Sequence, residues 1–258
     1  MEPPQILRAM GITAPGERWR VNCALYGFVE SPTDWRNHRD ETLKKLTWQC
    51  NGMECHLRPT AERHLWEIRE GQNLKGFMVT YVDDFLTTAE AGMMRALLGK
   101  IRETWVCSEP EFAERGKTMR YCGYDIEKME KGYALRQANY IQDLLKRRGV
   151  KGTEMVPMMK AEEGEDEVDA PIETTRAAQA ITGELPLLAQ RTRPDIGFAV
   201  SFMSRMIHKR PTYVCRIGDH VLAYLNGTMS HGLIYHGEGD RDMLKIYADA
   251  SYGPSHEN

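Results

Sequence analysis

Two adjacent aspartates, Asp83 and Asp84, are the residues whose types and spacing most directly suggest chemistry. They follow GFMVTYV at residues 76–82, an uncharged run rich in β-formers, and Phe85 and Leu86 resume the apolar pattern. The pattern predicts a β-hairpin with the acid pair at its tip. Neighbouring carboxylates repel each other at neutral pH, and a bound divalent cation is the usual means of offsetting that repulsion. Mg²⁺ or Mn²⁺ is therefore the expected cofactor, for metal-assisted phosphoryl chemistry.

The acid pair also has an ordinary interpretation, in which Asp83 and Asp84 simply belong to a solvated turn. Two-residue hairpin turns favour Asn-Gly or Asp-Gly because both positions need positive φ, and Asp-Asp meets that need poorly. We therefore expect something other than turn geometry to select these residues.

Helices are expected on both sides of the hairpin. Pro32 is placed to open a helix over residues 34–48, and a capping-box pattern at Thr87 and Glu90 opens another. A stripe near residue 200 is expected to be core, because such spacing normally marks a buried face. The apolar residues at helical spacing are Trp35, Leu43 and Leu46, then Met93, Leu97, Ile101 and Trp105, then Phe198, Phe202 and Met206, then Ile217, Val221 and Leu225.

A basic helix end and an acidic stretch lie between these helices. Two short strands around residues 131–132 are expected, followed by a helix from about Gln137 that stops at Gly149. The basic last turn of this helix suits either the negative end of the helix dipole or contact with a nucleic-acid backbone. Seven acidic residues and no basic one lie between Glu162 and Glu173, which predicts a solvated linker.

Composition limits the class of protein. The 258 residues are 41% hydrophobic and 28% charged, enough apolar material for one or two globular domains. With a net charge of -3, a nucleic-acid partner would be held by local patches. No apolar run approaches the length of a membrane span, and no signal peptide is predicted.

Six scattered cysteines indicate a reducing compartment rather than a disulfide-stapled domain. Cys50, Cys55, His56 and His64 offer the weaker idea of a zinc site. The spacing differs from the usual C-x₂-C pairs, so ordinary thiols and surface histidines are expected instead.

Tyr81-Val82-Asp83-Asp84 resembles the YVDD box of reverse transcriptases, and companion motifs follow in the order of Ty1/copia-type retrotransposons. LYGFVESP at 25–32 resembles the family's L-Y-G-L-K-Q-[SA]-P stretch, and YCGYDI at 121–126 resembles its F-L-G-[IY]-[ED]-I strand. RTRPDI at 191–196 resembles the T-R-P-D-[IL] signature, and YADAS at 247–251 resembles the opening strand of RNase H.

The resemblance spans about residues 20 to 253 and implies roles for single residues. Asp83 and Asp84 would be catalytic and hold the metal, and Asp249 would be the first metal ligand of an incomplete RNase H site. The other implied roles are nucleotide or template contact for Gly27, Ser31, Pro32, Tyr81 and Val82, primer grip for Cys122, Gly123 and Tyr124, and nucleic-acid backbone contact for Lys146, Arg147, Arg148, Arg191 and Arg193. For the last two arginines, pairing with a carboxylate such as Asp195 is the alternative.

Two departures from the family pattern bear on activity. Val29 and Glu30 stand where the family has Lys and Gln, which is expected to weaken triphosphate binding through charge repulsion. The V-D-V-x-x-A-F-L-x-G strand that supplies the third polymerase carboxylate has no counterpart in the sequence. The isolated chain is therefore expected to have weak or no polymerase activity.

The resemblance implies an α+β fold, with an incomplete reverse-transcriptase palm of antiparallel sheet and helices and then a mostly helical thumb and connection. The expected parts are a partial palm at 1–128, a thumb start at 129–160, the acidic linker at 161–175, the helical thumb and connection at 176–242, and a truncated RNase H-like start at 243–258. Implied partners are an RNA or DNA primer-template, dNTP and the rest of a Pol polyprotein. The implied location is intracellular, in cytoplasmic virus-like particles or the nucleus. The alternatives are a non-catalytic nucleic-acid-binding module and a decayed remnant that makes no stable product.

Overall fold

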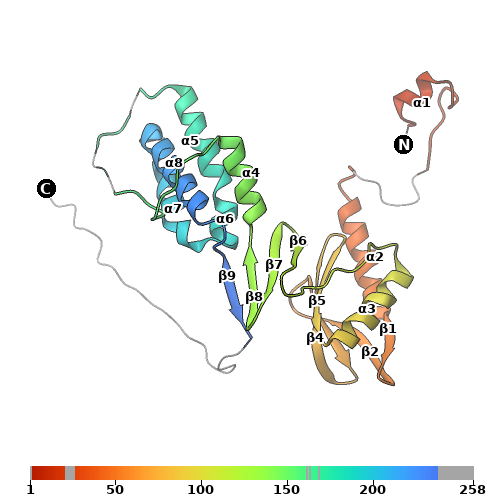
Figure 1. Ribbon diagram of the computed structural model, residues 1–258. Coiled ribbons are helices and arrows are strands. Elements are labelled where there is room, and N and C mark those ends of the chain that lie inside the picture. Colours follow the sequence, from red (N-terminus) through yellow and green to blue (C-terminus); the bar gives the residue numbers. More distant parts are fainter. Residues whose placement is uncertain (1, 21–26, 161, 163, 168, 238–258) are drawn as a thin grey trace. The chain divides into compact units, whose positions relative to one another are not determined.

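The chain folds as two compact units, Met1–Pro110 and Glu111–Asn258. The computed structural model in Figure 1 describes residues 2–20, 27–160, 162, 164–167 and 169–237. Each unit has its own antiparallel sheet and its own buried apolar core. The boundary expected at residue 128 falls inside the sheet of the second unit, where the strand that ends at Met129 is paired on both sides.

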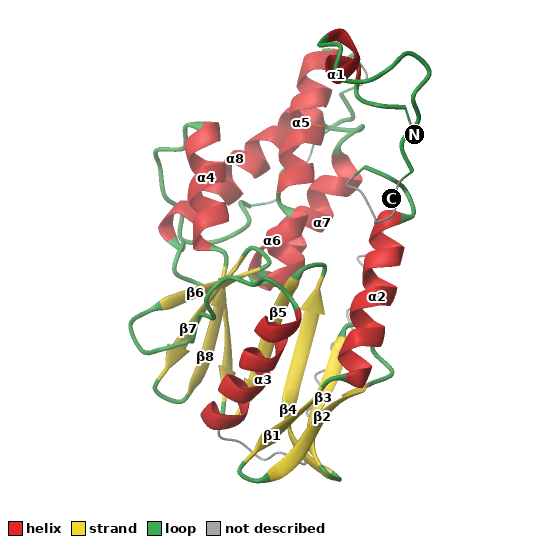
Figure 2. Ribbon diagram, turned by 90° about the vertical axis from the view of Figure 1, so that its right-hand side faces the viewer, coloured by secondary structure: helices red, strands yellow, loops and turns green. Residues whose placement is uncertain are grey.

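The first unit contains a five-stranded antiparallel meander in the order β1-β2-β3-β4-β5. Its strands are β1 (Thr47–Cys50), β2 (Met53–Pro59), β3 (Leu65–Glu70), β4 (Asn73–Tyr81) and β5 (Asp84–Ala89). Two long helices, α2 (Ser31–Lys45) and α3 (Ala91–Thr104), pack with this sheet (Figure 2), and a short helix, α1 (Gln5–Ala9), precedes them.

Both long helices and the sheet contribute to one core in the first unit. On α3 the buried positions are Met93, Leu97 and Ile101, at the spacing that predicted the helix. The capping-box prediction is wrong, because Thr87 lies within β5 and the N-cap residue Glu90 makes no side-chain capping hydrogen bond.

The predicted hairpin is confirmed as β4 and β5, paired from Gly76↔Ala89 to Tyr81↔Asp84. Gly76 allows the two strands to approach, since a Cβ at this position would collide with the carbonyl oxygen of Thr88.

The second unit combines a four-stranded antiparallel sheet, in the order β6-β7-β8-β9, with helices. The strands are β6 (Thr118–Tyr121), β7 (Tyr124–Met129), β8 (Gly132–Arg136) and β9 (Leu233–His236). The helices are α4 (Ala138–Arg148), α5 (Ile172–Glu184), α6 (Pro186–Arg191), η1 (Pro194–Ile196), α7 (Gly197–Met206) and α8 (Pro211–Gly227). Gly149 ends α4 in the left-handed conformation, as predicted. The structure is thus α+β with antiparallel sheets, and the assignment of palm, thumb and connection stays a prediction.

The prediction that Phe198, Phe202 and Met206 form a core stripe is wrong for Phe198, which is 66% exposed. Phe202 and Met206 are partly buried and pack against the core. Apolar residues lie on several sides of α7, so helical spacing alone does not choose the buried face. The residues of α7 that are buried are Ala199, Val200 and Met203.

The acidic stretch is anchored at described residues rather than free in solvent. The Glu162 carboxylate accepts two hydrogen bonds from Arg216, each 2.8 Å long, and the Glu162 backbone N–H donates to the Tyr213 hydroxyl at 2.9 Å. Glu167 accepts a 3.0 Å hydrogen bond from the backbone N–H of Thr212 at the start of α8. Glu162 and Glu167 thus contact α8, which supplies a cation and free N–H groups, and the linker assignment stays a prediction.

Candidate functional site

The acid pair lies at the end of the β4–β5 hairpin, but its position in the turn differs from the prediction. Tyr81 pairs with Asp84, so the two turn residues are Val82 and Asp83, and Asp84 begins β5. Both carboxylates are exposed. Val82 has a φ of 48°, which is unusual for a β-branched residue.

Two side chains of α2 hold this turn. The Arg39 guanidinium donates from Nη1 to the Val82 carbonyl oxygen at 2.9 Å, and the Trp35 indole N–H donates to the same oxygen at 3.2 Å. The helical spacing in the sequence identified Trp35 but not Arg39, whose side chain is only 1% exposed. The signal that could have found it is an arginine one helical turn beyond Trp35.

Aromatic rings pack around the base of the turn. Trp105, just after α3, lies 6.2 Å from Trp35 and stacks on Phe85, with ring centroids 6.0 Å apart. Phe85 directly follows the acid pair in β5. The cluster joins the hairpin to both long helices, which limits its freedom to bend.

The stretch that resembles L-Y-G-L-K-Q-[SA]-P leads into the same helix. Gly27 has a φ of 95°, and Ser31 and Pro32 form the first turn of α2. Val29 is 92% exposed, and Glu30 is the N-cap residue of α2. The structure thus places this stretch at the start of the helix that holds the acid-pair turn.

Asp83 and Asp84 fit part of a metal site. Their carboxylates supply the hard oxygen ligands that Mg²⁺ prefers, and neither forms an ion pair with a described residue. Among the described residues, however, no group of three or more His, Cys, Asp or Glu side chains could hold a metal ion. Cys50 and Cys55 are buried free thiols.

A second group of predicted residues meets in the second unit. Cys122 and Gly123 form the tight turn between β6 and β7, with φ values of 48° and 80°. Tyr124 begins β7, and the Arg191 guanidinium lies 5.3 Å above its ring. The implied primer-grip residues and the first arginine of the T-R-P-D-like stretch are therefore neighbours.

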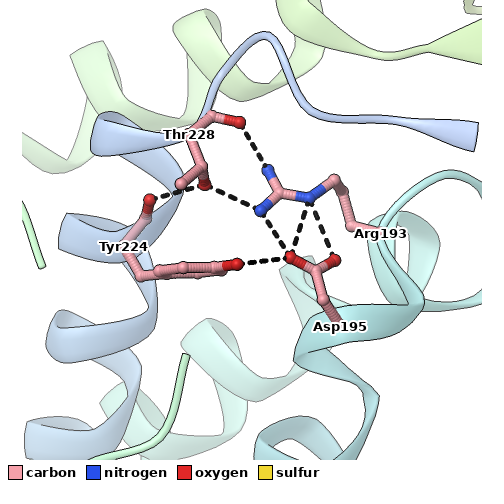
Figure 3. Close-up of polar contacts among 4 residues, drawn as sticks. All are labelled: Arg193, Asp195, Tyr224 and Thr228. Atoms are coloured by element: carbon pink, nitrogen blue, oxygen red, sulfur yellow. Dashed lines mark hydrogen bonds and ion pairs between the residues drawn. The ribbon is translucent and has the colours of Figure 1, made fainter. Parts of the chain in front are cut away.

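Arg193 takes the alternative role left open by the sequence (Figure 3). Its side chain is 1% exposed, donates to both Asp195 carboxylate oxygens, and donates to the carbonyl and hydroxyl of Thr228 at 3.0 and 2.7 Å. Tyr224 completes the cluster by donating to Asp195 at 2.8 Å. Arg193 therefore joins η1 to the end of α8 and has no surface to offer a phosphate.

The basic end of α4 is partly neutralised. Arg148 pairs with Glu184 at 2.7 Å, and Arg147 lies 3.9 Å from the same residue. Lys146 is exposed and forms no ion pair with a described residue. Asp249, the implied RNase H ligand, lies outside the described residues.

Acid is expected to weaken the Arg193 cluster. Burial would raise the pKa of Asp195, but the hydrogen bonds from Arg193 and Tyr224 outweigh it and hold the pKa below its ordinary value. A carboxyl with a lowered folded-state pKa contributes stability that is complete well above its unfolded value near 3.9 and is lost as pH falls through the folded value.

The gap in unfolding free energy between the protein and its Asp195→Asn variant should therefore narrow from pH 6 to pH 2. Urea unfolding followed by hydrogen exchange of α8 at several pH values measures it. A gap that stays constant across this range would contradict the account.

The chain is similar in sequence to proteins of transposons. The putative transposon Ty5-1 protein of Saccharomyces cerevisiae is 24% identical over 246 residues, covering 94% of this chain and 75% of that protein. The retrovirus-related Pol polyprotein from transposon RE1 of Arabidopsis thaliana is 25% identical over 236 residues, 90% of this chain but 15% of the polyprotein. That from transposon TNT 1-94 of Nicotiana tabacum is 23% identical over 252 residues, 93% of this chain and 18% of the polyprotein.

The homologues of this chain are thus Ty5/copia-type and retrovirus-related Pol polyproteins from transposons, which confirms the family resemblance drawn from the motifs. The chain spans only a small part of the plant polyproteins. No family model matches the chain, and no solved structure does. Within the described residues, no helix is long and apolar enough to cross a membrane.

Proposed function

We propose that the chain is a fragment of the reverse-transcriptase region of a retrotransposon Pol polyprotein, with Asp83 and Asp84 as two of the carboxylates that hold divalent cations during nucleotidyl transfer. Mg²⁺ or Mn²⁺ would supply charge stabilisation of the transferring phosphoryl group. The observation that carries the proposal is a pair of exposed carboxylates on a hairpin turn held by Arg39, with no ion pair to a described residue, in a chain homologous to Pol polyproteins.

The role of the remaining residues follows from their positions. Helix α2 holds the acid-pair turn, and its first residues, Ser31 and Pro32, would lie near the nucleotide or template. In the second unit, Tyr124 with Arg191 would contact the primer strand. Two carboxylates from one hairpin leave the metal cage incomplete, so weak or no primer extension is expected from the isolated chain.

A chimera tests the proposal most sharply. Residues 27–110 would replace their counterpart in an active copia-type reverse transcriptase that keeps its own third carboxylate strand. The chimera should extend an oligo(dT) primer on poly(rA) with Mg²⁺ or Mn²⁺, and Asp83→Asn with Asp84→Asn should reduce extension about a hundredfold or more, because metal ions contribute several kcal/mol.

Asp34→Asn, a single change of the same kind in the first turn of α2, is the control and should leave extension unchanged. A chimera whose activity is insensitive to the changes at Asp83 and Asp84 would refute the assignment. Robust incorporation by the isolated chain would refute the expectation of inactivity.

Restoring the family residues at the start of α2 should improve nucleotide use. In the chimera, Val29→Lys with Glu30→Gln is expected to lower the KM for dNTP about three- to tenfold, because one negative charge is removed and one positive charge is added at an exposed, partly screened position. Steady-state primer extension measures this. Glu41→Gln on α2 is the control, and an unchanged KM in the double variant would contradict the proposed nucleotide contact.

A nucleic-acid-binding module without chemistry is the second candidate, favoured by cations beside aromatic rings in the second unit. Arg191 lies over Tyr124, and Arg205 lies 5.8 Å above Phe202, next to the exposed Phe198. This candidate predicts salt-sensitive binding of a duplex that survives Asp83→Ala and Asp84→Ala. Fluorescence anisotropy at several salt concentrations measures it, and loss of binding on those two changes alone would argue against it.

A further inference from the structure

The Val82-Asp83 turn lacks the local chemistry found in two other tight hairpins of this chain. The turns Asn51-Gly52 and Cys122-Gly123 both have glycine at the second position, where positive φ is free of steric cost. The acid-pair turn has no glycine, and its positive φ falls on a β-branched valine. A contact outside the turn must therefore stabilise this backbone.

That contact is made at one atom, the carbonyl oxygen of Val82. It accepts hydrogen bonds from Arg39 Nη1 at 2.9 Å and from Trp35 Nε1 at 3.2 Å. The carbonyl belongs to the peptide unit that joins Val82 to Asp83. Its direction fixes the backbone from which both carboxylates project.

Of the two donors, Arg39 makes the shorter hydrogen bond, and burying its charge costs free energy. The Arg39 side chain is 1% exposed, and burying a guanidinium is unfavourable unless it is paired. Asp40 provides the pairing, with its Oδ1 2.9 Å from Nε and 2.8 Å from Nη2 of Arg39. Nη1 is then available to donate to the Val82 carbonyl. Only the planar guanidinium of an arginine can contact Asp40 and this carbonyl at the same time.

We propose that Arg39 is a positioning residue for the acid pair: it locks the Val82-Asp83 peptide so that both carboxylates are held ready for a divalent cation that Arg39 itself does not touch. The inference rests on the proposed function, but it concerns a residue outside the motifs that carry the family resemblance. If Arg39 supported only the fold, its replacement would lower stability without changing the affinity for the cation.

The test uses the full chain with Arg39→Met, Arg39→Lys and the matched control Arg36→Met on the same helix. Mn²⁺ binding is measured by the electron paramagnetic resonance signal of the free ion, and the exchange of the Asp83 and Asp84 amides by NMR without metal. Arg39→Met should weaken Mn²⁺ binding about tenfold and speed amide exchange at the turn by a similar factor, since small misplacements of ligating groups have large effects. Arg39→Lys should recover part of both losses, and Arg36→Met should change neither.

Unchanged Mn²⁺ affinity and exchange in a folded Arg39→Met protein would overturn the inference. If that variant does not fold, Arg39→Lys and Trp35→Phe decide instead, because each weakens the hold on Val82 while keeping much of the packing. Wild-type Mn²⁺ binding that is insensitive to Asp83→Asn with Asp84→Asn would sink the proposed metal function, while the exchange rates would still decide the role of Arg39.

Discussion

Replacing Arg193 by methionine is expected to lower the free energy of unfolding of the second unit by about 3–5 kcal/mol, because breaking a buried ion pair leaves its partners without compensation. The change would leave Asp195 without its cation and the carbonyl of Thr228 without its donor. All five tryptophans lie in residues 1–110, so tryptophan fluorescence reports only the first unit. Native-state hydrogen exchange of α8 peptides is therefore the appropriate measurement.

Arg191→Met is the matched control, since it is the same substitution two residues away on an exposed side chain. Its effect should stay within about 0.5 kcal/mol, as for most surface changes. Nucleic-acid binding should show the reverse order, with Arg191→Met the more harmful of the two in proteins that remain folded. Equal effects on stability would contradict the assignment of Arg193 to the interior.

Leu97→Ala is expected to destabilise the first unit by about 2–5 kcal/mol, the usual range for truncating a buried leucine. Leu97 is fully buried on the face of α3 that packs on the sheet. Urea unfolding followed by tryptophan fluorescence measures the change, because every indole lies in this unit.

The adjacent Leu98 gives the control, because it is only partly buried and the substitution is identical. Leu98→Ala should cost clearly less, about 1 kcal/mol, in proportion to the smaller area removed from water. If the two variants were equally unstable, the orientation of α3 over the sheet would be wrong.

Local patterns were sufficient to predict several elements. The uncharged β-forming run before Asp83 predicted the β4–β5 hairpin, and the four-residue spacing from Met93 to Ile101 predicted α3. Gly149 marked the end of α4 because glycine readily adopts the positive φ of the residue that follows a helix. In each case the signal lies within a few residues of the structure that it specifies.

Features that depend on contacts distant in sequence were not predictable. Arg39 lies 43 residues before the carbonyl that it holds, and its spacing of one helical turn from Trp35 does not by itself show that an arginine in a charged helix is buried. Glu162 pairs with Arg216 across 54 residues, although a run of acids ordinarily predicts a solvated segment. For Phe198 the sequence predicted the helical period correctly but the buried face of the helix wrongly, because several sides of α7 are apolar.

In the candidate site, too, local sequence predicted some features and distant contacts determined the others. The motifs identified Asp83 and Asp84, but the turn residues are Val82 and Asp83, because the register places Tyr81 opposite Asp84. The sequence left two roles open for Arg193, and burial selects pairing with Asp195. Residue types thus suggested candidate groups, whereas tertiary packing decided which of them face solvent.

The measurement that tests the central claim most directly is a Mn²⁺ titration of the full chain, its Asp83→Asn, Asp84→Asn double variant and the Asp34→Asn control. The account predicts weak, saturable binding that the double variant loses and the control retains. Coincident titration curves for all three proteins would contradict the assignment of this hairpin turn as part of a polymerase metal site.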